Sequence, residues 1–288
     1  MKKQFLLGVG CQKGGTTWLH SQLIKAPQFG NGFAKEYHFF DSLYLRDRQH
    51  IARIRQERLS HFLRESRSIV PASLLWQCLF LIEDNAYYSY FDSLWRSSDR
   101  VAMVGDITPA YCGLNWTHFR EIRAKLESFG FDVKVVFIMR DPFERIYSSV
   151  RASKKRMLRF SGSTLVVDGS LPPEDEDLLL SAYKDPGIAF RTRYDLTMQN
   201  LEKAFAPDQI FYTLYEDLFR PPCLSRMASF LGVDVDIFDA GQFLNVSPRS
   251  GGIISEAIVR QIVDYYSDVY EFVSHQFAVE GKWKSFDL

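Results

Sequence analysis

Residues 5–18 read FLLGVGCQKGGTTW, and this stretch decides the fold. The apolar run Phe5–Val9 has the length of a buried β-strand, and Thr16–Ile24 has a helical pattern. A glycine-rich turn joins the two. Such a strand, turn and helix N-terminus aim backbone N–H groups and the positive end of the helix dipole at an anion. Residues 5–18 therefore predict a phosphate-binding turn at the end of a buried strand.

Three further apolar runs are typical of buried parallel strands: Val101–Val104, Val133–Met139 and Ile210–Leu214. Helical patterns lie between the runs at 116–129 and 142–158, and Asp141 and Pro142 supply an N-cap and a first helical residue for the second. This alternation predicts an α/β fold with a central parallel sheet flanked by helices. Ligands of such sheets bind beyond the carboxyl ends of the strands, so chemistry is expected in residues 10–17, 106–109, 140–141 and 215–217.

The rest of the chain predicts additions to a single domain over residues 1–288. Residues 45–98 show charged amphipathic segments and no strand pattern, which indicates a helical insertion. Glycines and prolines indicate an exposed loop at about 161–180. The long helical pattern at 255–277 predicts one helix capped by Ser255 or the residue before it.

Composition narrows the class of partner. The 35 basic residues balance the 35 acidic ones, so nothing global favours nucleic acid, and anion recognition has to be local. The four cysteines are widely spaced, which fits a reducing compartment. No apolar stretch approaches the roughly 20 residues of a transmembrane helix. We therefore expect a soluble, cytoplasmic protein with no nucleic-acid partner, and the oligomeric state stays open.

Lys13 stands in an unusual place for a phosphate loop. A nucleotide triphosphatase would carry its lysine directly before the hydroxyl residue, in the pattern GxxxxGK[ST]. Here Thr16 holds the hydroxyl position and Lys13 lies three residues earlier. Thr16 and Thr17 can donate hydroxyl groups to phosphate or sulfate oxygens without a metal, and we expect no metal site. An ordinary surface lysine in a glycine-rich turn is the alternative.

Two motifs carry a family resemblance. Lys13-Gly14-Gly15-Thr16-Thr17-Trp18 resembles the 5′-phosphosulfate loop (roughly KxGTTW) of the sulfotransferases that use 3′-phosphoadenosine 5′-phosphosulfate (PAPS). Residues 140–148, RDPFERIYS, resemble the family's 3′-phosphate motif. The resemblance implies a P-loop-like three-layer fold, PAPS as donor, 3′,5′-adenosine bisphosphate as product and no required metal. It assigns Lys13 to Trp18 to the phosphosulfate, Arg140 and Ser148 to the 3′-phosphate, and Arg249 to a late loop over that phosphate.

Residues 35–41, KEYHFFD, place ionisable groups in an apolar stretch, where the pKa of a carboxyl group tends to rise. The stretch resembles KExHFFD of heparan-sulfate 3-O-sulfotransferases and related bacterial enzymes, which implies that Glu36 deprotonates an acceptor hydroxyl while Lys13 neutralises the leaving oxygen. His38 is the second candidate base. Ile107 stands where the heparan enzymes often carry lysine, so the acceptor stays open between a carbohydrate and a small molecule such as a lipid or phenol.

Two other functions fit parts of this pattern. A P-loop kinase shares the fold and the glycine-rich turn but places its lysine differently, and a non-catalytic nucleotide-binding protein would keep the fold alone. Two groups of basic residues could line a groove for an anionic glycan or form solvated helix faces: Lys154, Lys155, Arg156 and Arg159, and Arg46, Arg48, Arg53, Arg55 and Arg58.

Overall fold

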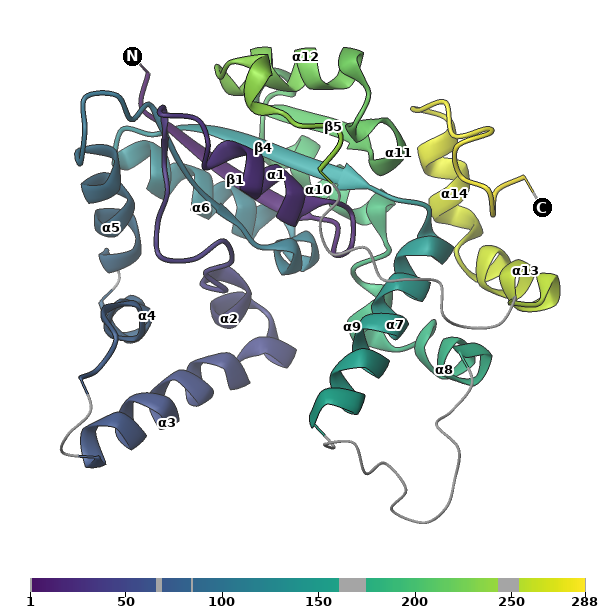
Figure 1. Cartoon of the computed structure of the whole chain (residues 1–288), viewed down its shortest axis with the longest axis horizontal. Coiled ribbons are helices and arrows are strands. Elements are labelled where there is room, and N and C mark those ends of the chain that lie inside the picture. Colours follow the sequence, from purple (N-terminus) through teal and green to yellow (C-terminus); the bar gives the residue numbers. More distant parts are fainter. Residues whose placement is uncertain (1, 66–68, 84, 161–174, 243–253, 288) are drawn as a thin grey trace.

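A five-stranded parallel sheet organises the chain (Figure 1). The computed structural model describes residues 2–65, 69–83, 85–160, 175–242 and 254–287. The strands are β1 Gln4–Gly10, β2 Phe29–Gly30, β3 Met103–Ile107, β4 Asp132–Met139 and β5 Ile210–Leu214, in the order β2-β3-β1-β4-β5. Every neighbouring pair is parallel, so all carboxyl ends lie at one edge, with β1 in the centre.

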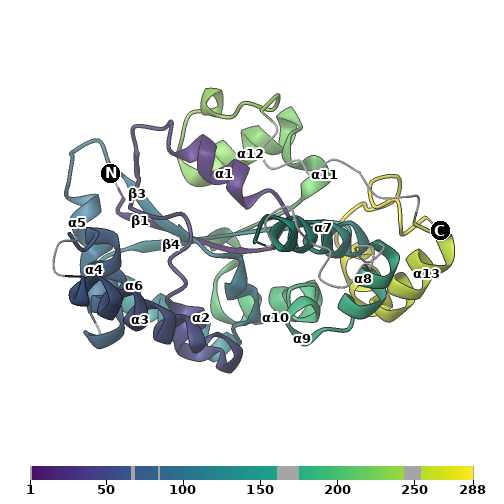
Figure 2. The same ribbon diagram turned by 60° about the horizontal axis from the view of Figure 1, so that its bottom comes forward.

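Helices cover both faces of the sheet. In chain order they are α1 Thr16–Leu23, α2 Phe40–Tyr44, α3 His50–Arg64, α4 Ala72–Ile82, α5 Ala86–Trp95, α6 Trp116–Ser128, α7 Pro142–Phe160, α8 Asp175–Ala182, α9 Pro186–Ala189, α10 Tyr194–Ala204, α11 Tyr215–Leu218, α12 Pro221–Leu231, α13 Glu256–Tyr265 and α14 Ser267–Ser274. Figure 2 shows α1, α11 and α12 on one face and α6 and α10 on the other. The predicted α/β fold, a P-loop-like arrangement of three layers, is confirmed.

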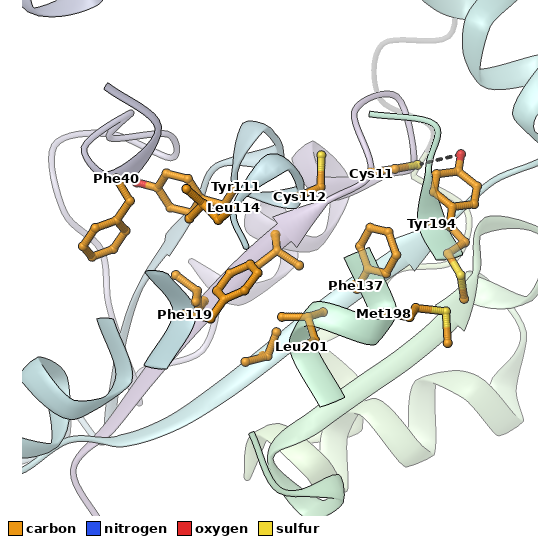
Figure 3. Packing of buried hydrophobic residues seen from close by; sticks show 14 of the residues in the cluster. Cys11, Phe40, Tyr111, Cys112, Leu114, Phe119, Phe137, Tyr194, Met198 and Leu201 are labelled. Carbon is orange, nitrogen blue, oxygen red and sulfur yellow. Dashed lines mark hydrogen bonds between the residues drawn. The ribbon is translucent and has the colours of Figure 1, made fainter. Parts of the chain in front are cut away.

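Each face has its own apolar core because strands buried on both sides present alternate side chains to opposite layers. The larger core contains Phe5, Leu7 and Val9 of β1, and the smaller contains Leu6 together with α1 and α12. In the larger core, Phe137 of β4 packs near Tyr194 and Met198 of α10 (Figure 3). The same view shows the Tyr194 hydroxyl donating to Cys11 Sγ over 3.6 Å. The turn after β1 is thereby fixed to the helical layer below it.

The strand predictions hold, with two differences. Ile210–Leu214 agrees at both ends, and the first and third strands agree to within one residue. The second strand lies two to three residues later than predicted, at Met103–Ile107, so Asp106 belongs to the strand, opposite Leu7 of β1. The two-residue strand β2 was not predicted, because Phe29 and Gly30 show no apolar run.

The predicted helices after β1, β3 and β4 are confirmed, and Asp141 Oδ1 accepts from the Phe143 N–H over 3.0 Å as the predicted N-cap. The single helix predicted at 255–277 is wrong. It is divided into α13 and α14 at Tyr266, whose buried hydroxyl donates to the Tyr183 carbonyl. The loop expected at 161–180 ends by Asp175, where α8 begins, and residues 161–174 lie outside the described part.

The range 45–98 contains a 3₁₀ turn at Arg46–Arg48 followed by α3, α4 and α5, and its described residues contain no strand. Figure 1 shows α3 and α4 away from the sheet, whereas Tyr87 and Phe91 of α5 are buried in the larger core. Arg55 of α3 is buried and donates to the Tyr37 carbonyl. The expectation that Arg55 is solvated or lines a glycan groove is therefore wrong.

Two further findings concern the chain as a whole. All four cysteines are buried and carry free thiols. Within the part that the structure describes, no helix is both long enough and apolar enough to cross a membrane.

Candidate active site

The turn after β1 is shaped by close packing against β4. Lys13 and Gly15 adopt left-handed backbone conformations, with φ of 70° and 89°. A Cβ on Gly14 would lie 2.6 Å from Cys11 Sγ and 3.0 Å from the Ile138 carbonyl oxygen, so only glycine fits there. Gly15 is the N-cap of α1, with no side-chain cap and no acidic residue in the first turn. The N–H groups at the start of α1 are thus available to an anion.

Positive charge gathers around Lys13. Burial lowers the pKa of Lys13, and repulsion from Arg156, Arg140 and Arg151 lowers it further, while Glu36 opposes the change. Arg140 follows β4, and the other two arginines lie on α7. The positive charges of these three arginines act on the turn after β1, which makes this turn a local candidate site for an anion in a chain of balanced charge.

Arg140 is held beside the turn by three contacts. Its Nη1 donates to the Lys13 carbonyl over 3.2 Å, and its Nη2 lies 3.1 Å from Glu144 Oε2. The guanidinium also stacks on Tyr215 at 4.8 Å from the ring centre. Ser148 lies one turn beyond Glu144 on α7 and therefore shares its helix face. The ion pair with Glu144 and the bond to the Lys13 carbonyl together hold the Arg140 guanidinium beside the loop.

Side chains from residues 16–41 form a continuous line of contacts, which we call the Thr16–Asp41 network. Lys35 Nζ donates to Thr16 Oγ1 over 3.0 Å and to Glu36 Oε1 over 2.6 Å. Glu36 Oε2 lies 3.3 Å from His38 Nε2, and His38 Nδ1 lies 2.8 Å from Asp41 Oδ2. The network connects the N-terminus of α1 to a carboxylate and an imidazole.

The electrostatics of Glu36 differ from the sequence-based expectation. Burial by itself raises the pKa of this carboxyl group, as expected. Hydrogen bonds from His38 and the adjacent Lys35 outweigh burial and lower the pKa of Glu36 to about 2. The expected rise is wrong because the sequence does not show that two cations hold the two oxygens.

The pKa of His38 is changed in the opposite direction, upward. Burial lowers its pKa, but bonds to Asp41 and Glu36 raise the pKa to about 9, so the ring is an imidazolium at neutral pH. Both ring nitrogens face carboxylate oxygens, and Asp41 is fully buried. The Glu36 side chain is 37% exposed. Glu36 is therefore an ionised carboxylate that is partly exposed to solvent, whereas His38 is protonated and Asp41 is buried.

A family model described as "Sulfotransferase family" matches residues 6–236, which include the turn, the Thr16–Asp41 network and Arg140. The chain belongs to the sulfotransferase family.

Two solved structures are similar to this sulfotransferase, and the first agrees with its fold. A sulfotransferase from Alicyclobacillus acidocaldarius is 18% identical, covers 96% of each chain and gives a TM-score of 0.57. The sulfotransferase domain of the Synechococcus PCC 7002 olefin synthase is 18% identical over 92% of this chain and 94% of that chain, with a TM-score of 0.46. A comparison with curated proteins gives no significant match.

The other residues of this sulfotransferase that the sequence motifs singled out differ in burial and in contacts. The Trp18 ring is 2% exposed, stacks on Phe238 and donates to the Asp239 carbonyl, so its side chain packs the smaller core and only its backbone faces the turn. Thr17 is exposed at the start of α1. Arg249 lies outside the described residues. Ile107 is buried in the smaller core and packs against Gly8.

The sequence motifs did not indicate Arg151 or Asp41. Arg151 follows Ser148 by three residues and so shares its helix face. Arg156 is exposed on α7 and lowers the pKa of Lys13, and its two expected roles, in a glycan groove or on a solvated helix face, stay predictions. Lys154 of the same group pairs with Asp175 of α8 at 2.7 Å. Among described residues, no group of three or more His, Cys, Asp or Glu side chains is arranged to hold a metal ion.

Proposed function

We propose that this sulfotransferase moves a sulfuryl group from PAPS to an acceptor hydroxyl. The observation that carries the proposal is the Thr16–Asp41 network, which links the anion-binding end of α1 to an exposed carboxylate through Lys35. We therefore assign the nucleotide donor to the end of β1 and the acceptor to the adjoining end of β3. Membership of the family argues against the kinase alternative.

The residues around the turn fit the donor. Backbone N–H groups of residues 15–18 and the Thr17 hydroxyl suit the phosphosulfate oxygens, and the Lys13 ammonium suits the leaving oxygen. Arg140 and Ser148 suit the 3′-phosphate, for which an arginine fork gives charge-assisted bonds. Arg249 remains a proposed contact to the same phosphate. When bound, PAPS supplies the sulfuryl group, and 3′,5′-adenosine bisphosphate is the product.

Glu36 is the proposed general base. An acceptor hydroxyl becomes more acidic as its oxygen forms a bond to sulfur, so a carboxylate of low pKa can still take the proton in an in-line displacement. Lys35 and His38 hold its two oxygens and keep it ionised. His38 is the weaker candidate base, because a ring that is already an imidazolium has no lone pair to accept a proton.

The acceptor class stays broad, a carbohydrate or a small molecule. Ile107 points into the smaller core, so the lysine of the heparan enzymes has no counterpart at this position. Free thiols on all four cysteines are consistent with the cytoplasm as the proposed location.

Calorimetric titration with 3′,5′-adenosine bisphosphate in EDTA tests the donor. We expect saturable binding without magnesium, whereas binding of ATP only with magnesium, and none of the bisphosphate, would contradict the proposal. A screen of carbohydrate, phenol, lipid and peptide acceptors with sulfate-labelled PAPS then tests transfer. A protein that binds the bisphosphate and transfers sulfate to none of them, nor to water, would be the non-catalytic alternative.

A further inference from the structure

Asp106, near the end of β3, is a fully buried carboxylate surrounded by donors. Its Oδ1 accepts from Thr108 Oγ1 over 2.6 Å and from the Tyr37 N–H over 3.3 Å. Its Oδ2 accepts from the hydroxyls of Tyr111 over 2.6 Å and Tyr87 over 2.9 Å. Burial raises the pKa of Asp106 to about 6 against the effect of these bonds, so the group is an anion at neutral pH.

Two of the four donors also hold the segment that carries the candidate base. The His38 N–H donates to Thr108 Oγ1 over 3.4 Å, and the Phe39 N–H donates to the Tyr111 hydroxyl over 3.2 Å. With the direct bond from Tyr37, three successive backbone N–H groups end on Asp106 or on its partners. His38 has φ of 49°, a left-handed conformation that a residue with a Cβ keeps only when its surroundings impose it.

The same segment is fixed from its carbonyl side. The Ile107 N–H donates to the Lys35 carbonyl over 3.0 Å. Arg55 of α3 donates to the Tyr37 carbonyl, and its side chain is buried. A backbone bond from β3 and a side-chain bond from α3 therefore hold residues 35–39, which carry Glu36 and His38.

The charge of Asp106 determines the direction of these bonds. A hydroxyl that donates its single proton to Asp106 keeps only lone pairs for a second partner. Thr108 and Tyr111 are therefore acceptors toward the N–H groups of His38 and Phe39. An asparagine at this position would have only one oxygen atom. Its NH₂ group would face two of the four hydrogen-bond donors and could not accept from them. A carboxylate is required at this place.

We propose that Asp106, acting through Thr108 and Tyr111, is a positioning residue that sets the geometry of Glu36 and His38. This inference rests on the proposed function for its effect on transfer, but the geometry of His38 can be measured without it. It also gives the helical insertion a role, since α3 supplies Arg55 and α5 supplies Tyr87.

Two tyrosine variants isolate the effect. Tyr111→Phe and Tyr87→Phe both keep the ring and both remove one hydroxyl from Asp106 Oδ2, but only Tyr111 also accepts from the Phe39 N–H. For Tyr111→Phe we expect kcat of sulfate transfer to fall about 10- to 100-fold with the affinity for the bisphosphate unchanged, because misplaced groups affect the transition state. Tyr87→Phe should show a clearly smaller loss of kcat.

The pKa of His38, measured by NMR of the imidazole and assigned with His38→Gln, is the second readout. It should lie at about 9 in the native chain. In Tyr111→Phe it should fall by about one unit as the ring leaves its carboxylates, and in Tyr87→Phe by less. Thermal denaturation of both variants identifies a loss caused only by unfolding.

The outcomes separate the two proposals. Equal effects of the two tyrosine variants on kcat and on the pKa of His38, in a chain that transfers sulfate, overturn the positioning role and leave the proposed function. A chain that transfers nothing but shows the selective pKa shift supports the positioning role and overturns the function. If Tyr111→Phe does not fold, Thr108→Val replaces it, and recovery of the pKa of His38 in Thr108→Ser is expected. Failure of serine to restore that pKa contradicts the inference.

Discussion

Two buried aspartates, at the ends of the two strands that flank β1, hold the two sides of the site, and they do so with different parts of the chain. Asp106 in β3 receives donors from Tyr37, Tyr87, Thr108 and Tyr111, all in the first 111 residues. Asp141 after β4 receives donors from Phe143 and from the C-terminal region: the Tyr270 hydroxyl over 2.8 Å and the Ser285 N–H over 3.2 Å. The side of the site proposed to bind the sulfuryl acceptor is thus built from the first 111 residues, whereas the side proposed to bind the nucleotide depends on residues 270–285.

The C-terminal residues are attached to the end of β5 as well. Trp283 Nε1 donates to Glu216 Oε2 over 3.1 Å, and Lys282 Nζ lies 2.6 Å from Asp217 Oδ2. Burial raises the pKa of Glu216 to about 7. Glu216 and Asp217, which follow β5, are thus paired with residues near position 283. Asp141, which is next to Arg140 in the chain, is therefore held by Ser285, about 140 residues later.

The largest expected effect is the loss of kcat when Glu36, on the side of the site proposed to bind the acceptor, is substituted. Glu36→Gln should lower kcat for sulfate transfer by about 10²- to 10⁴-fold, because an amide cannot take the proton of the acceptor. The dissociation constant of the bisphosphate should stay within about twofold, since the donor contacts lie elsewhere. Calorimetry and labelled-sulfate transfer measure the two quantities. The exposed Glu57→Gln of α3 is the matched control, and an equal loss in both variants would contradict the role of Glu36.

On the side of the site proposed to bind the nucleotide, a substitution of Arg140 should weaken binding of the bisphosphate. Arg140→Ala removes charge-assisted bonds of about 1.5–3 kcal/mol, so bisphosphate affinity should fall about 10- to 150-fold. Transfer at saturating PAPS should fall much less. Arg96→Ala, an exposed arginine paired with Asp92 on α5, is the control. Unchanged affinity in Arg140→Ala would remove this residue from the donor site.

The support of Asp141 gives a smaller effect on both stability and binding. Ser285→Ala removes the hydroxyl that donates to Asp141 and leaves the backbone N–H bond in place. We expect the free energy of unfolding in urea to fall by about 1 kcal/mol, with weaker bisphosphate binding and an unchanged pKa of His38. Ser274→Ala on α14, where the half-buried hydroxyl bonds only to the Glu271 carbonyl of its own helix, should change neither binding nor the pKa of His38. A shift in the pKa of His38 would show that the two aspartates do not act separately.

Stability should also depend on pH through His38. Its pKa is raised from 6.5 to about 9 in the folded chain, so the protonated ring stabilises the fold fully below about pH 6.5. This contribution is lost as the pH rises through about 9. The difference in unfolding free energy between the native chain and His38→Gln should therefore narrow between pH 7 and 10. A difference that stays constant over this range would mean that the ring is neutral in the folded state.

The order of strands and motifs could be predicted from the sequence because apolar runs and glycine turns are local signals. The second strand was misplaced because Gly105 and Asp106 interrupt the apolar run, and Asp106 is tolerated in a buried strand only with the hydroxyls that surround it. The division at Tyr266 was missed for a similar reason, since its buried partner is the distant Tyr183 carbonyl. These errors lie where a polar group is satisfied by a residue far along the chain.

The sequence by itself determined the α/β class, the glycine turn with its displaced Lys13, and the motifs that carry the family resemblance, because spacing along the chain specifies each of them. Only the tertiary structure decided the charge states of the site. The low pKa of Glu36 and the high pKa of His38 arise from Lys35 and Asp41 at hydrogen-bonding distance. The separate supports of Asp106 and Asp141 likewise appear only after folding, since electrostatics depend on distance in space and on burial.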